Sequence, residues 1–134
     1  MRLTLPLLIL VLVVLAGGSA HAHHSHSGFL LDQKVSVEGA LEQLTYANPH
    51  VLLRIRTAEG VLYTAEWQAA SWLQYHAHVT LTTLRVGDRV VVIGSPSRDP
   101  ASHELVQLKE VRRPRDGWTY QVIQEGSDPP STKH

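Results

Sequence analysis

The stretch that decides the fold is residues 35–46, which read VSVEGALEQLTY. Every second side chain from Val35 to Leu41 is apolar or small, and the alternation resumes one residue late at Leu44. A β-strand with a bulge at Glu42-Gln43 explains this shift, because a bulge inserts one extra residue into a strand. A helix would need apolar spacings of three and four residues, which this stretch lacks. We therefore predict a bulged first strand.

The chain on the C-terminal side of this stretch predicts more strands and one helix. Alternating or β-branched runs predict strands at residues 51–56, 61–67, 89–93 and 103–111, with a last short strand at 118–122. Glu59-Gly60 predicts the tight turn between the second and third strands. Residues 69–77 lack alternation, which favours a short helix, and residues 95–100, SPSRDP, predict a loop. We expect Trp67, on its strand, and Trp72, on the helix, to pack in the core.

The order of these elements predicts an all-β fold. We expect a small OB-like closed barrel of five to six strands, with one short helix between strands three and four. A bulge in the first strand lets a sheet curl and close. OB barrels bind their ligands with the loops between strands 1 and 2 and strands 4 and 5. A β-sandwich is the alternative, but it does not explain a helix in that position.

The N-terminal residues predict a secretory signal peptide. Arg2 is followed by an unbroken apolar run of ten residues from Leu7 to Ala16, and then by small residues up to Ala20-His21-Ala22. A membrane-spanning helix needs about 20 apolar residues, so we expect no membrane span after cleavage. A cut after Ala22 makes His23 the new N-terminus, whereas a cut after Ala20 leaves His21 there.

The expected organisation follows from this cleavage. Residues 1–22 are the signal peptide, 23–34 a histidine-rich arm, 35–123 the OB-like barrel domain and 124–134 a disordered tail. Export of this kind places the protein in the periplasm.

The composition excludes several classes of protein. The chain has 134 residues with 12 Lys and Arg, 12 Asp and Glu, nine His and no Cys. A balanced charge argues against a nucleic-acid partner, and we expect the basic run from Arg112 to Arg115 to be a solvated strand end. The absence of Cys excludes disulfides, thiolate zinc sites and a thiol nucleophile. No G-x-S-x-G or His-Glu-x-x-His motif occurs, so we do not expect an enzyme.

An ordered set of motifs runs through the chain. The set consists of His23-His24-Ser25, Phe29 with Asp32 and Lys34, Val37-x-Gly39, Asn48-Pro49-His50, Glu66, Leu84-x-x-Gly87-Asp88-x-Val90 and Gly94-x-Pro96-x-Arg98-Asp99. In these residues the chain resembles an uncharacterised family of small exported bacterial proteins, defined as a domain of unknown function. The resemblance runs from about His23 to about Val122. It implies export and a small β-barrel, and it implies no activity. The chain departs from that pattern at His26, where the family has an aromatic residue, and at His78-Val79, where it has a Gly-aromatic pair.

The histidines carry the functional hypothesis. Imidazole nitrogens bind Cu(II), Zn(II) and Ni(II), and Cu(II) binds tightest in the Irving–Williams order. The candidate ligands are His23, His24, His26, His50 and His103. An N-terminal His23 would chelate one ion with its amine and its own ring, and in an OB barrel the loops that carry His50 and His103 lie at one end. We therefore predict an exported protein that binds or buffers copper, with zinc and nickel as alternatives.

Other interpretations of the same residues remain open. The arm histidines are also compatible with a solvated, disordered segment of weak metal affinity. His50 in Asn48-Pro49-His50 is equally compatible with a role in fixing the loop. His76 and His78 point about 200° apart on a helix and are not expected to chelate. A non-metal binding module for a peptide, a glycan or a periplasmic partner protein is the alternative function, and a copper-dependent redox enzyme is a third.

Overall fold

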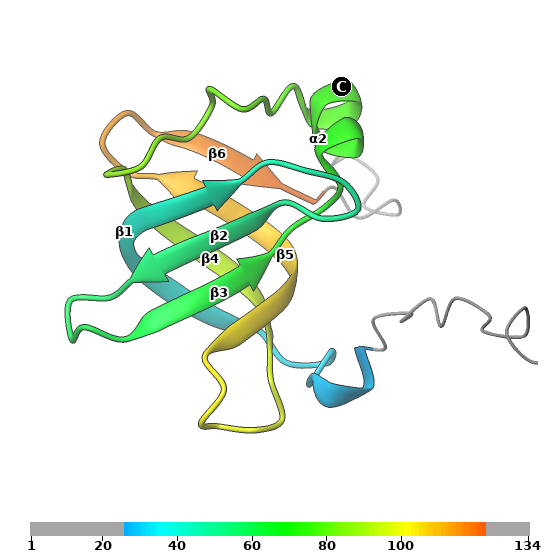
Figure 1. Cartoon of the computed structure of the whole chain (residues 1–134), viewed down its shortest axis with the longest axis vertical. Helices are drawn as coiled ribbons and strands as arrows, with labels where there is room; N and C mark the ends of the chain where they lie inside the picture. The colour runs from blue at the N-terminus through cyan, green and yellow to red at the C-terminus, as the bar shows by residue number, and fades with distance from the viewer. Residues whose placement is uncertain (1–25, 123–134) are drawn as a thin grey trace, which may run out of the picture.

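The computed structural model of the protein describes residues 26–122 (Figure 1). The predicted signal peptide, His23, His24 and the predicted tail at 124–134 lie outside these residues. The elements in chain order are η1 (His26–Gly28), β1 (Val35–Thr45), β2 (Leu52–Arg56), β3 (Leu62–Glu66), α2 (Ala70–Ala77), β4 (Arg89–Pro96), β5 (Glu104–Arg113) and β6 (Trp118–Gln121). The predicted strands and the predicted helix are all present, and their ends differ from the predicted ones by at most three residues.

The strands close into a barrel with the strand order of an OB fold. The sheet order is β3-β2-β1-β4-β5-β6, and a parallel pairing of β3 with β5 closes the circle of the first five strands. The closing pairs are Thr64 with Glu104 and Ala65 with Leu105. β6 pairs with β5 as an additional strand outside the circle. The predicted OB-like barrel with one short α-helix between strands three and four is confirmed.

β1 belongs to both halves of the barrel. Its first six residues pair with β4, and five of its last six pair with β2, with Ala40 common to both. The register with β2 shifts between Leu41 and Gln43, which is the predicted position of the bulge. Gly39 lies just before this shift, where a Cβ atom would stand 2.2 Å from the carbonyl oxygen of Arg56 on β2. Only glycine allows the two strands to approach this closely.

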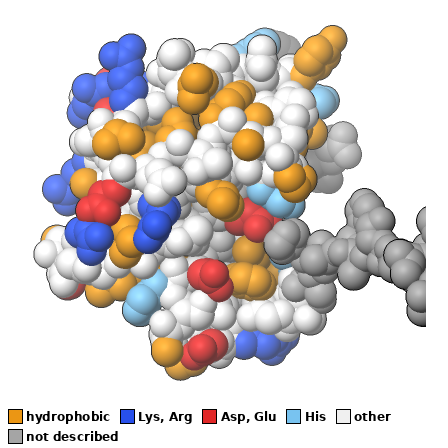
Figure 2. All heavy atoms as spheres, in the orientation of Figure 1, with side chains coloured by type: hydrophobic (Ala, Val, Ile, Leu, Met, Phe, Trp, Pro, Cys, Tyr) orange, Lys and Arg blue, Asp and Glu red, His pale blue; other side chains and the backbone are white. Residues whose placement is uncertain are grey.

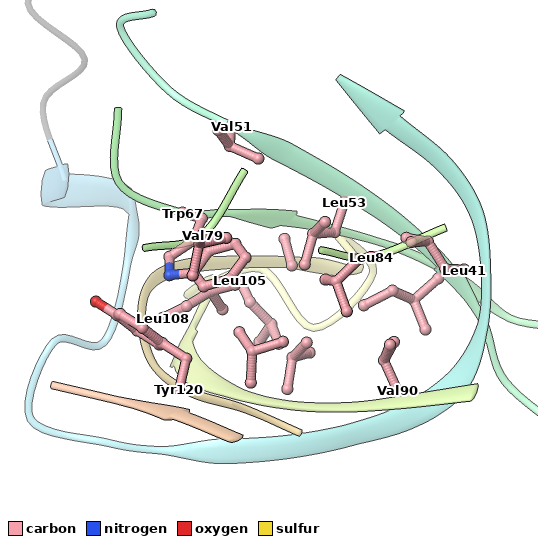
Figure 3. Close-up of a cluster of buried hydrophobic side chains, with 14 of the residues drawn as sticks. Leu41, Val51, Leu53, Trp67, Val79, Leu84, Val90, Leu105, Leu108 and Tyr120 are labelled. Carbon is pink, nitrogen blue, oxygen red and sulfur yellow. The ribbon is translucent and has the colours of Figure 1, made fainter. Parts of the chain in front are cut away.

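A single core fills the barrel (Figure 3). It receives side chains from every strand and from the helix, among them Leu41, Leu53, Leu73, Val90 and Leu108, each at most 2% exposed. Trp67 and Tyr120 close one end of this core with their rings 4.9 Å apart in an edge-to-face contact. The expected packing of Trp67 is confirmed, since its exposed fraction is 3%.

Two residues of helix α2 pack into the core. Ala70 and Leu73 are its buried side chains, while Trp72 is 39% exposed. The expectation that Trp72 packs in the core is therefore wrong, because Leu73 occupies the inward face of so short a helix. The Asn48 side chain accepts hydrogen bonds from the backbone N–H and the hydroxyl of Ser71, at 3.0 and 3.1 Å, and so satisfies a donor in the first turn. Within residues 26–122 no helix is long and apolar enough to cross a membrane.

Two further sequence expectations need correction. Ser95 and Pro96 belong to β4 rather than to the predicted loop, because they pair with Val106 and Leu105 of β5. The side chain of Arg113 is only 12% exposed and forms an ion pair with the buried Asp88 at 3.3 Å. This arginine is therefore not the solvated strand end that the basic run predicts, because a buried carboxylate faces it.

The approach of β1 to β2 at Gly39 predicts a large loss of stability in Gly39→Ala. The added methyl group would overlap the backbone of β2, which has no flexible side chain to move aside. We expect the free energy of unfolding to fall by about 3 kcal/mol in urea titrations followed by circular dichroism. Gly28→Ala is the matched control, because nothing lies within 4 Å of the position that its new Cβ atom would take. Equal stability of the two variants would contradict the close approach.

Candidate functional site

The segment that carries His26 is held against the barrel by backbone contacts. Phe29 forms an isolated bridge with Ser97, and the Leu30 N–H donates to the Pro96 carbonyl at 2.9 Å. Arg98 donates its backbone N–H and its Nε to two carbonyls of this segment, at 2.8 and 2.9 Å. Figure 1 shows η1 beside the loop between β4 and β5. The described part of the arm is therefore docked, and the loop between β4 and β5 sets its position.

A second histidine, His50, is placed by the hairpin of β2 and β3. The backbone of Val51 exchanges hydrogen bonds with Trp67 and Gln68, which extends the pairing of Leu52 with Glu66 by one step. His50 follows next and lies beside the end of β3. Its Nδ1 is 3.2 Å from the Trp67 carbonyl oxygen and 3.5 Å from Oε1 of Glu66. Both partners are acceptors, which favours a proton on Nδ1 of His50.

Glu66 joins the two histidines. Its Oε1 lies 3.6 Å from Nε2 of His26 and 3.5 Å from Nδ1 of His50. The three side chains are half-buried, with exposed fractions of 20% for Glu66, 32% for His26 and 34% for His50. Figure 2 shows histidine and acidic side chains next to each other on this face of the molecule. We call these three residues the His-Glu cluster.

The two ring nitrogen atoms of His26 have different surroundings. Its Nδ1 lies 3.5 Å from Nε2 of Gln107 on β5. Its Nε2 faces Glu66, yet it is buried and has no hydrogen-bond partner among the described residues. A buried polar nitrogen without a partner costs about 1–3 kcal/mol and calls for an explanation. This atom is the feature of the cluster that points most directly to a missing partner.

The structure brings two of the five predicted ligands together. His26 and His50 meet at Glu66, whereas His23 and His24 lie outside the described residues. The His103 ring packs against Tyr63 with ring centres 5.1 Å apart. The N–H of Thr64 donates to the His103 carbonyl, and Thr64 lies two residues before Glu66, which corresponds to about 7 Å along a strand. His103 therefore lies beside Tyr63 and Thr64 rather than at the Glu66 end of β3.

Glu66 is among the motif residues of the sequence, but it is not predicted as a metal ligand, and Gln107 is not singled out at all. The place of Glu66 could have been predicted, because the turn at Glu59-Gly60 fixes the register that sets the end of β3 beside His50. Gln107 has no such signal. The backbone of Gln107 itself has a positive φ of 50°, and no pattern in the sequence indicates this conformation.

The donor set of the cluster is suited to a transition metal, but it does not form a finished site. Two imidazoles and one carboxylate are ligands of zinc and copper. Among residues 26–122, no group of three or more His, Asp or Glu side chains is arranged so that it would hold a metal ion as it stands. Any ion at the cluster needs further ligands or a small rearrangement.

Comparison with known proteins gives the family and no activity. Residues 11–107, which are 97 of the 134, match a family described as a family of unknown function (DUF6152). The chain therefore belongs to this family. The matched residues include the whole His-Glu cluster and Gln107. No curated protein matches the chain.

The contacts of Arg98 predict that this side chain controls the docking of the arm. Arg98→Ala removes the bond from Nε to the Ser27 carbonyl, and we expect amide hydrogen exchange at Leu30 to accelerate about tenfold. The measurement is hydrogen exchange by NMR. Arg89→Ala is the matched control, because its guanidinium is 2.7 Å from Glu38 on the barrel surface and does not contact the arm. Unchanged exchange at Leu30 in Arg98→Ala would rule out this anchoring role.

Proposed function

We propose that this protein is an exported, periplasmic metal-binding protein that holds a copper ion with the histidines of its arm and of the loop between β1 and β2. The observation that carries the proposal is the His-Glu cluster, in which the buried, unpartnered Nε2 of His26 and the ring of His50 face one carboxylate oxygen of Glu66. Its role would be to buffer, deliver or sense the metal. The proposal assigns no catalytic activity.

The spacing of the donor atoms supports this proposal. A tetrahedral zinc ion, the alternative to copper, has bonds of about 2.0–2.1 Å and separates its ligand atoms by about 3.3–3.4 Å. The distance from Nε2 of His26 to Oε1 of Glu66, 3.6 Å, differs from this value by only a few tenths of an ångström. The contact of His50 with Glu66 also matches the usual arrangement around metals, in which a ligand histidine donates its other N–H to a carboxylate or a carbonyl.

The arm completes the ligand set in this proposal. Three residues do not hold an ion by themselves, and His23 and His24 precede His26 by only three and two positions. A cleavage after Ala22 would add the terminal amine of His23 as a further donor. Among common divalent ions, copper binds strongest to such nitrogen-rich sets, with zinc and nickel as the alternatives.

A groove between α2 and β6 favours a second candidate function. Its walls include Trp72 and His76 of the helix and Trp118 and Tyr120 of the strand. The rings of Trp72 and His76 stack at 4.8 Å, and Trp72 is 39% exposed. Aromatic walls with a few polar groups are typical of sites for small ligands and peptides. A non-metal binding module for a peptide, a glycan or a partner protein is therefore the second candidate.

The metal proposal predicts which histidines matter. We expect Cu(II) titration by calorimetry to give sub-micromolar affinity, and His26→Ala and His50→Ala each to weaken it at least tenfold, because each removes one ligand. The protein is expressed with its native N-terminal residues, and its mature N-terminus is determined by mass spectrometry. Copper-dependent consumption of oxygen with a reductant would reveal redox activity in the same samples.

The control for this experiment is His103→Ala, which removes an exposed histidine outside the cluster. Its affinity should equal that of the wild type. The metal proposal fails if the wild type binds no tighter than micromolar, or if His103→Ala loses as much affinity as the two cluster variants.

A further inference from the structure

We propose that the groove between α2 and β6 binds an extended, uncharged segment of a partner protein, which pairs with β6 as a seventh strand of the sheet. This inference rests on the second candidate function given above, for which it names the ligand and the way in which the ligand binds. It is independent of the metal proposal, because no residue of the His-Glu cluster lines the groove.

One edge of β6 has no neighbouring strand among the described residues. The sheet order ends at β6, which pairs with β5. The N–H of Val122 donates to the Lys109 carbonyl across that pairing, at 2.9 Å. Because bonded and non-bonded pairs alternate along antiparallel strands, Tyr120 also bonds to β5. Thr119 and Gln121 therefore direct their backbone N–H and C=O groups away from β5, so this edge offers two donors and two acceptors.

This edge opens into the groove. Thr119 and Gln121 line it, and Trp72 and His76 of α2 form the opposite wall. Figure 1 shows α2 next to the end of β6. The groove has a volume of about 740 Å³, within the range of ligand sites in proteins. An extended chain in the groove would meet the backbone groups of β6 on one side and the aromatic ring of Trp72 on the other.

The chemistry of the groove selects an uncharged peptide. None of the residues that line it is Asp, Glu, Lys or Arg. The strand β6, which reads WTYQ, also lacks the charged residues and prolines with which proteins block an exposed edge. Another extended backbone matches the N–H and C=O groups of such an edge, as in peptides that bind by strand addition. A glycan could stack on the aromatic walls, but it lacks this regular alternation of donors and acceptors.

A partner protein is a better source of this segment than the chain itself. The C-terminal residues 127–134, SDPPSTKH, include charged residues and two prolines, which cannot donate to a neighbouring strand. A second copy would bring its β6 together with its own α2, whereas the groove already has α2 as its other wall. A lone extended segment meets neither obstacle.

Two pairs of variants test the edge and the opposite wall. Thr119→Pro removes one outward N–H and leaves the bonds to β5, while Thr119→Val keeps that N–H and the shape of the side chain. Trp72→Ala removes an aromatic ring from the wall. Its matched control is Tyr75→Ala, because Tyr75 lies on the same helix, is 85% exposed and does not line the groove.

The probe is a phage-displayed library of short random peptides, selected against the purified whole chain, with the affinities of enriched peptides measured by fluorescence anisotropy. We expect the enriched peptides to be poor in charged residues. Their affinity should fall about tenfold in Thr119→Pro and in Trp72→Ala, and stay within about twofold of the wild type in the two controls. Circular dichroism shows whether each variant is folded, and the Trp72 pair decides the test if Thr119→Pro is not.

Hydrogen exchange by NMR locates the bound peptide. We expect the amides of Thr119 and Gln121 to exchange fast in the free protein and about tenfold more slowly with peptide. The proposal is overturned if no peptide is enriched, or if these two amides are already protected in the free protein, since the chain's own tail or a second copy would then occupy the edge.

The outcomes also separate this inference from the functions on which it builds. Peptides that bind the wild type and Thr119→Pro equally would refute strand addition and leave the second candidate function standing. Each of these results leaves the metal proposal unaffected, because the copper titrations rest on His26→Ala and His50→Ala.

Discussion

The bend of β1 is the constraint on which the barrel depends. One strand pairs with β4 through its first half and with β2 through its second half, so it has to turn through the corner between two faces of the sheet. The bulge after Leu41 supplies the turn, and Gly39 lets the backbone of β2 come close at the same corner. Without this bend β3 could not reach β5, and the parallel pairing at Thr64 and Ala65 that closes the circle would not form.

Closure of the barrel also builds the His-Glu cluster. The hairpin of β2 and β3 places Glu66 beside His50, and the pairing of β3 with β5 brings Gln107 to the same region. The arm adds His26 through contacts with the loop between β4 and β5. Each partner of the cluster thus comes from a different part of the chain, and each is positioned by backbone hydrogen bonds rather than by its own side chain. The backbone that carries such a cluster is as rigid as the barrel to which it is bonded.

Most of the fold and two of the three residues of the His-Glu cluster could be predicted from the sequence. Alternation, the bulge and the turn at Glu59-Gly60 predict the strands, because period and turn chemistry act over a few residues. His26 and His50 are found by residue type alone. The position of His103 and the burial of Arg113 depend on registers between strands that are distant in sequence, and local patterns do not determine these. The contact of Gln107 could not be predicted for the same reason, since its positive φ accompanies the register shift between β4 and β5.

The docked arm bears on how a metal would be held. A histidine-rich segment that is free in solution loses conformational entropy when it wraps around an ion, and this loss reduces its affinity. In the present structure the bridge of Phe29 with Ser97 and the two bonds from Arg98 have already fixed the backbone up to His26. A ligand set that includes His26 and His50 therefore begins with two imidazoles in place, whereas a chelate made by His23 and His24 alone gains nothing from the barrel. If the protein binds a metal as proposed, the affinity should depend on the docking of the arm as much as on the histidines themselves.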